Sequence, residues 1–147
     1  MTKPPSPRPL SIKVIASIYL LGVLAGLTSR RKKHLVFGIL VEGHDLMIYH
    51  LIVSLLLLFL GTGLWQLRER ARREAMIFQG LALIDTSLNY FSNVGRILQW
   101  ATQNSADPSF ALVRLSLGGL RNLALHGLML WFLMKRKSAF VKPAKSP

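Results

Sequence analysis

The chain has 147 residues, of which 51% are hydrophobic, and its mean hydropathy of +0.38 is too apolar for a soluble domain of this length. Most of the lysines and arginines behind its formal net charge of +13 lie just beyond apolar runs, which favours lipid headgroups as partners and argues against nucleic acid. The chain has no cysteine, which excludes disulfides, thiolate metal sites and a lipidated cysteine anchor. These properties predict an all-α integral membrane protein.

Residues 1–9 hold four prolines and predict a short, disordered, basic N-terminus. The first expected span follows over about 10–27, with Lys13 one turn inside, where its long stem can reach the membrane interface. A basic stretch before an apolar run also occurs in signal peptides. No small-x-small cleavage site precedes the basic block at 30–33, so we expect this segment to remain in the protein as a span.

The second expected span, about 46–67, is 22 residues without Asp, Glu, Lys or Arg, and a basic turn follows at 68–73. A helix of this length rises roughly 33 Å, enough to cross the ~30 Å hydrocarbon core of a bilayer. The apolar run before it, 35–41, is too short to cross. We expect a short interfacial element there, or an outer extension of the second helix. A rival interpretation makes 34–43 re-entrant and keeps 30–33 in the cytoplasm.

A third span is expected over about 75–95, with Asp85 as its one acid, and a fourth over about 112–134. The fourth helix is expected to start at Asp107, a capping residue followed by proline, and to end at the basic run 135–137. The expected organisation is a disordered N-terminus, a single transmembrane domain and a basic C-terminal tail: 1–9, 10–137 and 138–147.

The distribution of basic residues predicts the orientation of this four-helix bundle. Twelve lysines and arginines would lie on the side shared by the two termini and the 68–73 turn, and six on the other side. By the positive-inside rule, both termini are then cytoplasmic. The block at 30–33 opposes this assignment, because four consecutive basic residues resist translocation. Keeping that block inside, however, would move the 68–73 turn outside.

Polar residues within the expected spans predict a network inside the bundle. On the third span Asp85, Asn89 and Asn93, with Arg96 beyond them, recur every three or four residues and so share one stripe of a helix. Pairs four residues apart on the second and fourth spans do the same. The expected intramembrane polar network comprises Asp85, Asn89, Asn93, Arg121, Asn122, His126, His50 and Ser54.

Depth suggests which of these residues meet. At 1.5 Å per residue, Asp85 lies roughly 15 Å from the cytoplasmic helix end, and Arg121, Asn122 and His126 lie at roughly 20, 18 and 12 Å. An acid near the bilayer centre costs about 2.5 to 3.5 kcal/mol, so we expect Asp85 to face Arg121 or His126, with Asn122 completing the hydrogen bonds. Such a network either holds the spans together or forms a proton or ligand site at the midplane.

No cofactor, metal or catalytic residue is expected. His50 and His126 differ by about 13 Å in depth and therefore cannot share one haem iron. The polar residues before the second span, His34, Glu42, His44 and Asp45, lack the regular spacing of metal ligands. The sequence contains no nucleophile elbow, glycine-rich phosphate loop or paired carboxylates, so an enzyme is not expected.

Short motifs along the chain carry a resemblance to known proteins. These motifs are Arg8-Pro9-Leu10, Gly63-Leu64-Trp65 before a basic turn that contains Ala71-Arg72, and Leu130-Trp131-Phe132-Leu133 before 135–137 and Phe140. In this order the chain resembles small, uncharacterised four-helix membrane proteins of prokaryotes, some grouped as domains of unknown function. The resemblance implies a bacterial-type inner membrane and no established activity.

The expected function is that of a multi-pass, non-enzymatic scaffold or accessory subunit in a bacterial inner membrane. Its expected partners are the lipid bilayer with its anionic headgroups and either further copies of the chain or another membrane protein. The residues expected at headgroups are Arg68, Arg70, Arg72, Arg73, Lys135, Arg136 and Lys137. A small oligomeric transporter or channel component with a polar midplane site is the alternative, and a membrane enzyme is a weaker one.

Overall fold

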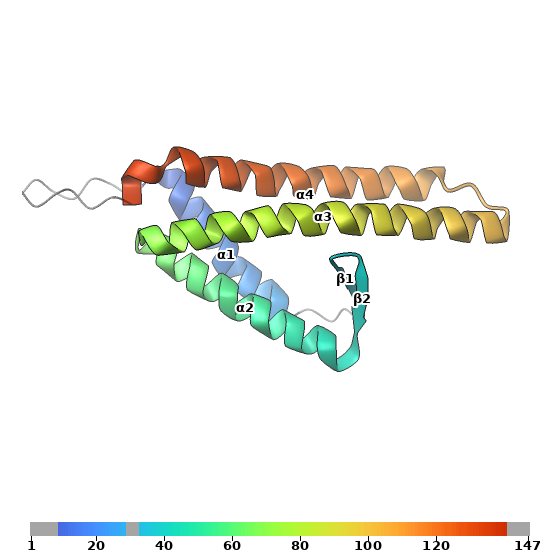
Figure 1. Cartoon of the computed structure of the whole chain (residues 1–147), viewed down its shortest axis with the longest axis horizontal. Helices are drawn as coiled ribbons and strands as arrows, with labels where there is room; N and C mark the ends of the chain where they lie inside the picture. Colours follow the sequence, from blue (N-terminus) through green and yellow to red (C-terminus); the bar gives the residue numbers. More distant parts are fainter. Residues whose placement is uncertain (1–8, 29–32, 141–147) are drawn as a thin grey trace, which may run out of the picture.

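The computed structural model describes residues 9–28 and 33–140, so the expected disordered N-terminus, most of the basic block and the end of the tail lie outside the described residues. The described residues are mostly helical, and three of their four long helices, α1, α2 and α4, are long and apolar enough to cross a membrane. The elements in order are α1 Leu10–Leu27, β1 Lys33–Val36, β2 Ile39–Glu42, α2 Gly43–Trp65, α3 Glu69–Asn104, α4 Ser109–Lys135 and the 3-10 turn η1 Lys137–Phe140 (Figure 1).

The helices form two antiparallel pairs arranged as a V (Figure 1). α1 packs along α2, and α3 packs along α4. The pairs meet where the chain turns from α2 into α3 over residues 66–68, which we call the closed end. They diverge toward the turn between α3 and α4 over residues 105–108, which we call the open end. The β1–β2 hairpin lies between the arms of the V on the open side and contacts both α2 and α3.

The hydrophobic core lies at the closed end. Its buried members come from all four helices and η1: Ile12, Ile15, Ala16, Tyr19, Leu60, Leu64, Ala75, Met129, Leu133 and Phe140. The outward faces of the helices stay apolar, and only 11% of the most apolar window of α4 is buried against the rest of the protein. Burial within the protein therefore leaves most of the apolar surface of the helices uncovered.

The segment before α2 is a β-hairpin, so the expected outer extension of the second helix is wrong. β1 pairs with β2 antiparallel, with Val36 opposite Ile39, which leaves a turn of two residues. Both turn residues, Phe37 and Gly38, have positive φ, at 50° and 80°. This is the pattern of a type I′ turn, whose twist matches that of paired strands. The turn therefore directs the short apolar run into two strands rather than into a helix.

α3 is longer than the expected third span and more polar than the other helices. Its 36 residues rise about 54 Å, well beyond the thickness of a hydrocarbon core. It is the one long helix that is not among the candidate spans of the described chain. The following turn agrees with the expected start of the fourth helix: the carboxylate of Asp107 accepts hydrogen bonds from Ser109 N at 2.9 Å and Ser109 Oγ at 2.6 Å.

The hairpin turn makes Gly38 intolerant of a side chain. A Cβ at this position would lie 2.8 Å from Ser92 Oγ on α3, in addition to the strain of its φ of +80°. We expect Gly38→Ala to lower the free energy of unfolding by more than the ~1–2 kcal/mol of left-handed strain alone. Unfolding of the purified protein in a mild detergent, followed by circular dichroism, measures this.

Two further glycines provide matched controls. Gly43 has a φ of +61° but open space around its Cβ position, so Gly43→Ala should show the strain alone. Gly80 lies inside α3 with nothing within 4 Å, so Gly80→Ala should stabilise by about 0.5–1 kcal/mol. Equal losses for Gly38→Ala and Gly43→Ala would show that the turn is not packed against α3.

Candidate functional site

Asp85 and Asn89 on α3 hold the tip of the hairpin, and we call these two residues the hairpin clamp. Phe37 N donates to Asp85 Oδ1 at 2.6 Å, and Gly38 N donates to Asn89 Oδ1 at 2.8 Å. Asn89 Nδ2 donates to Leu35 O and to Asp85 Oδ2, each at 3.0 Å. The four-residue spacing on one helix face lets both side chains meet successive amides of the turn. The clamp thereby satisfies backbone groups that have no strand partner.

Asp85 does not form the direct contacts expected with Arg121 or His126, although its carboxylate is close enough to His126 to interact with it electrostatically. Within the described residues it has neither a hydrogen bond nor an ion pair with Arg121 or His126. The Arg121 side chain is exposed, and its contacts with Asn122 Oδ1 are long, at 3.4 Å. The depths deduced from sequence brought these groups to one level. The depth estimate did not take the hairpin into account. In the structure, the carboxylate of Asp85 accepts a hydrogen bond from the hairpin backbone instead.

His126 instead belongs to a hydrogen-bonded chain across three helices. Gln79 on α3 is fully buried, and its Nε2 donates to Tyr19 Oη on α1 at 2.5 Å. Its Oε1 then accepts from Nδ1 of His126 on α4 at 2.6 Å. Sequence reasoning missed Gln79 because it lies off the stripe that carries Asp85. A glutamine within an otherwise apolar stretch of α3 was the available signal.

His50 and Ser54 do not join this network. Ser54 is buried between α1 and α2, and a Cβ on Gly26 of α1 would overlap its Oγ, so the two helices approach closely at this point. The His50 ring centroid lies 6.0 Å from that of His34. Within the described part of the chain, neither His50 Nε2 nor Ser54 Oγ has a hydrogen-bond partner. Ser54 therefore helps to pack the α1–α2 arm, whereas the His50 ring lies near the hairpin.

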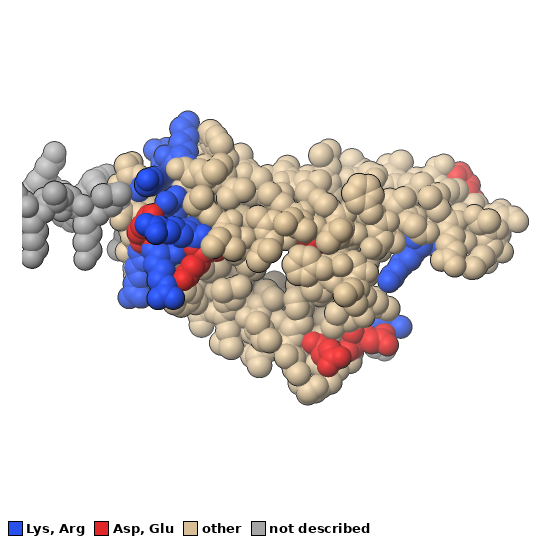
Figure 2. Space-filling view, in the orientation of Figure 1, with Lys and Arg blue, Asp and Glu red and all other residues tan. Residues whose placement is uncertain are grey.

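A cleft of about 860 Å³ lies between the hairpin and the α3–α4 pair. Five of the eight expected network residues line it: Asp85, Asn89, Asn93, Asn122 and His126. Lys33, Arg96 and Arg114 add three cationic side chains to the lining. In Figure 2, basic side chains lie where the hairpin faces the far part of α3. The polar stripe predicted on the third span thus lines a cleft between α3, α4 and the hairpin.

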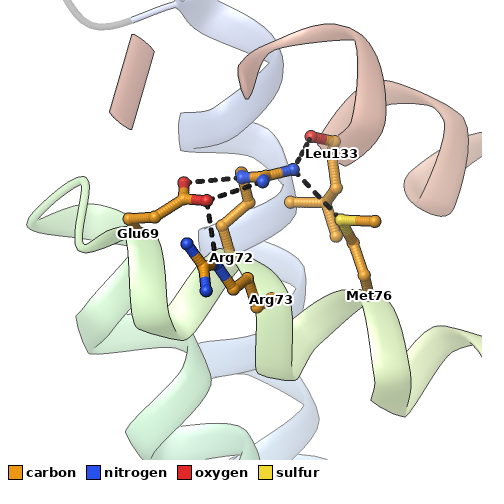
Figure 3. Close-up of polar contacts among 5 residues, drawn as sticks. All are labelled: Glu69, Arg72, Arg73, Met76 and Leu133. Carbon is orange, nitrogen blue, oxygen red and sulfur yellow. Dashed lines mark hydrogen bonds and ion pairs between the residues drawn. The ribbon is translucent and has the colours of Figure 1, made fainter. Parts of the chain in front are cut away.

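Arg72 ties the closed end together (Figure 3). Its guanidinium, on a side chain only 7% exposed, forms a bidentate ion pair with Glu69, with both N···O distances at 2.7 Å. It also donates to Leu133 O of α4 at 3.1 Å and lies 6.0 Å from the ring centroid of Phe140. Arg72 was expected at lipid headgroups, but it joins α3 to the end of α4. The other residues expected at headgroups are exposed: Arg68, Arg70, Arg73, Lys135, Arg136 and Lys137.

Glu69 is the carboxylate of this closed-end network. Hydrogen bonds from Arg72 lower the pKa of Glu69 from its ordinary value of 4.5 to about 2, with a smaller contribution from Arg73. Residues 69–73 precede the apolar part of α3, so the ion pair lies at the N-terminal end of this helix. In the described part of the chain, no group of three His, Asp or Glu side chains is placed to hold a metal ion.

Comparisons with protein-family models, with curated proteins and with solved structures found no match to this chain. Assignment of a function therefore depends on the geometry of the chain itself.

The hairpin clamp can be tested at its carboxylate. Asp85→Ala removes the acceptor of Phe37 N, and a hydrogen bond to a charged group contributes about 1.5–3 kcal/mol. We expect hydrogen exchange at the amides of Phe37 and Gly38 to accelerate at least ~10-fold, as read by mass spectrometry of peptides that cover the hairpin. Asp85→Asn keeps an acceptor oxygen and should accelerate exchange less. Unchanged exchange in Asp85→Ala would contradict the clamp.

The Glu69–Arg72 pair predicts a pH-dependent stability. The folded-state pKa of Glu69 is depressed, so the ionised pair stabilises the protein above pH ~4.5, and this contribution is lost as the pH falls toward 2. Melting temperatures of the wild type and Glu69→Gln should differ above pH 5 and converge toward pH 2. Glu74→Gln, which removes an ion pair to the exposed Arg70, should change the melting temperature less at neutral pH. A constant difference between wild type and Glu69→Gln at all pH values would refute the assignment.

Proposed function

We propose that the chain is a multi-pass integral membrane protein that acts as a non-enzymatic scaffold or accessory subunit. The observation that carries this proposal is that polar side chains between the helices are hydrogen-bonded to other elements of the protein. The clamp oxygens of Asp85 accept from the hairpin and from Asn89, and the Gln79 amide is bonded at both ends. Polar groups that already hold elements together inside a bundle contribute to its structure.

The exposed apolar surface supports insertion into a membrane. α3, which is too polar overall to rank as a candidate span, still presents an exposed apolar stripe at spacings of four and three residues: Ile77, Leu81, Ile84, Leu88 and Phe91. This stripe lies apart from the clamp residues. A helix that turns one apolar face to lipid and one polar face to a neighbouring cleft can span a bilayer. We therefore retain α3 as the third of four spans.

The charge distribution supports an orientation with the closed end in the cytoplasm. Figure 2 shows lysines and arginines gathered at that end, where α1 and α3 begin and α2 and α4 end. From Arg72 to Arg96, 24 residues of α3 rise about 36 Å, slightly more than one hydrocarbon core. The two arginines would then lie near opposite interfaces. A bacterial inner membrane, in which the positive-inside rule operates, is the location that we propose.

The cleft beside Asp85 favours a second candidate function. A volume of about 860 Å³ bordered by the clamp, Asn93, Asn122 and His126 resembles the polar cavity that a small transporter or channel component would need. In this alternative Asp85 has a second role besides docking the hairpin. The clamp hydrogen bonds weigh against this alternative, because a carboxylate that exchanged protons during transport would have to release the hairpin.

Reconstitution distinguishes the two functions. We expect the wild-type protein, inserted into liposomes that contain a pH-sensitive dye, to pass protons no faster than protein-free vesicles under an imposed pH gradient and membrane potential. Resistance of the protein to alkaline extraction serves as the control for insertion. Proton flux above the protein-free level that disappears in Asp85→Asn would refute the scaffold and support the transporter.

A further inference from the structure

We propose that the cleft between the hairpin and the α3–α4 pair binds the phosphate headgroup of an anionic phospholipid, with Arg96 and Arg114 as its phosphate ligands. This inference goes beyond the scaffold function, which does not require a bound lipid. The charge that lines the cleft, the depth of the two arginines and the polar groups below them support this site.

The cleft carries an excess of positive charge. Its lining includes Lys33, Arg96 and Arg114 but a single acid, Asp85, which is already hydrogen-bonded to the hairpin turn. Lys33 has a partner of its own, Glu42, at 3.0 Å. Neither arginine has an ion pair or a hydrogen bond to any residue in the described ranges 9–28 and 33–140. Two unpaired guanidinium groups around one cavity favour an anion, and their planar donors suit phosphate oxygens.

The two arginines lie at similar depth near the open end. Arg96 lies eight residues before the end of α3 and Arg114 five residues after the start of α4, so both are within about 12 Å of the turn that joins these antiparallel helices. In a bundle that spans the membrane from its closed end, this is the level of lipid phosphates. Leu115 of α4, on the closed-end side of Arg114, borders the same cleft and provides apolar contact for an acyl chain.

The deeper part of the cleft provides uncharged hydrogen-bonding groups. Asn122 lies eight residues beyond Arg114, about 12 Å closer to the closed end, and its Nδ2 has no partner in the described chain. Asn93 uses its Nδ2 for the carbonyl of Asn89, which leaves Oδ1 available. The carboxamide of Asn93, one turn below Arg96, lies at the level of the ester oxygens next to a lipid phosphate, whereas Asn122 lies deeper, at the level of the acyl chains. A phosphate on its own would leave these groups without ligand contacts.

Native mass spectrometry of the full chain, extracted in a neutral detergent, tests the proposal. The probes are phosphatidylglycerol, diacylglycerol and inorganic phosphate. We expect phosphatidylglycerol to be retained and diacylglycerol not. The double variant Arg96→Gln/Arg114→Gln should lower the affinity for phosphatidylglycerol roughly 30-fold, from about fivefold per arginine near a membrane surface. Arg96→Lys/Arg114→Lys keeps the charge and should retain most of the binding, which keeps the test valid if the glutamine variant misfolds.

A control of equal charge separates a built site from general attraction. Arg68→Gln/Arg136→Gln removes two exposed arginines that do not line the cleft. Equal losses of binding in this control and in Arg96→Gln/Arg114→Gln would overturn the proposal. Thermal stabilisation by inorganic phosphate that depends on Arg96 and Arg114, without retention of phosphatidylglycerol, would overturn the lipid as the source of the phosphate.

Discussion

Three hydrogen bonds between α3 and the hairpin set the shape of the open end, because they tie the hairpin turn to the clamp residues Asp85 and Asn89. The hairpin runs directly into α2, so the clamp also fixes the distance between the two helix pairs on this side. Both strands are short, and an isolated two-stranded hairpin is marginal in stability. The α3 side chains thus provide the support that the hairpin cannot provide for itself. Without them, nothing else on α3 would bond to the turn amides.

The closed end is held by different chemistry. There the apolar core joins all four helices, and the buried Arg72 connects α3 to the end of α4 through Glu69 and Leu133 O. Just inside that core, Gln79 links Tyr19 and His126. Buried polar groups of this kind are costly when any partner is missing, so each network favours one arrangement of the helices. A closed end fixed by packing and an open end fixed by the clamp together produce the V and the cleft within it.

This arrangement explains why the polar stripe of α3 serves two purposes. All four residues of the stripe border the cleft, but Asp85 and Asn89 are hydrogen-bonded to the hairpin, whereas Asn93 and Arg96 have no bond to it. The occupied part supports a scaffold. The part with available groups supports a bound anion at the open end. The proposed scaffold and the proposed lipid site are compatible, because a lipid seated between the hairpin and α4 would add contacts where the protein alone has few.

Local patterns in the sequence were sufficient to predict the helices. Apolar length and basic ends predicted four helices, and the structure confirms a mostly helical chain with four long helices, three of them apolar enough to span a membrane. The cap at Asp107 and the common face of Asp85 and Asn89 also follow from spacing alone. Each of these features depends on residues within a turn or two of one another.

Only the tertiary structure decided which groups meet. The partner of Asp85 is a backbone amide 48 residues away in sequence, and its availability depends on the two-residue turn at Phe37 and Gly38. The burial of Arg72 and of Gln79 depends in the same way on how α4 and α1 pack against α3. Periodicity assigns a side chain to a face of its own helix, but it carries no information about the element opposite. The sequence by itself therefore determined the polar stripe, and the packing of the hairpin and helices determined that it became a clamp and the wall of a cleft.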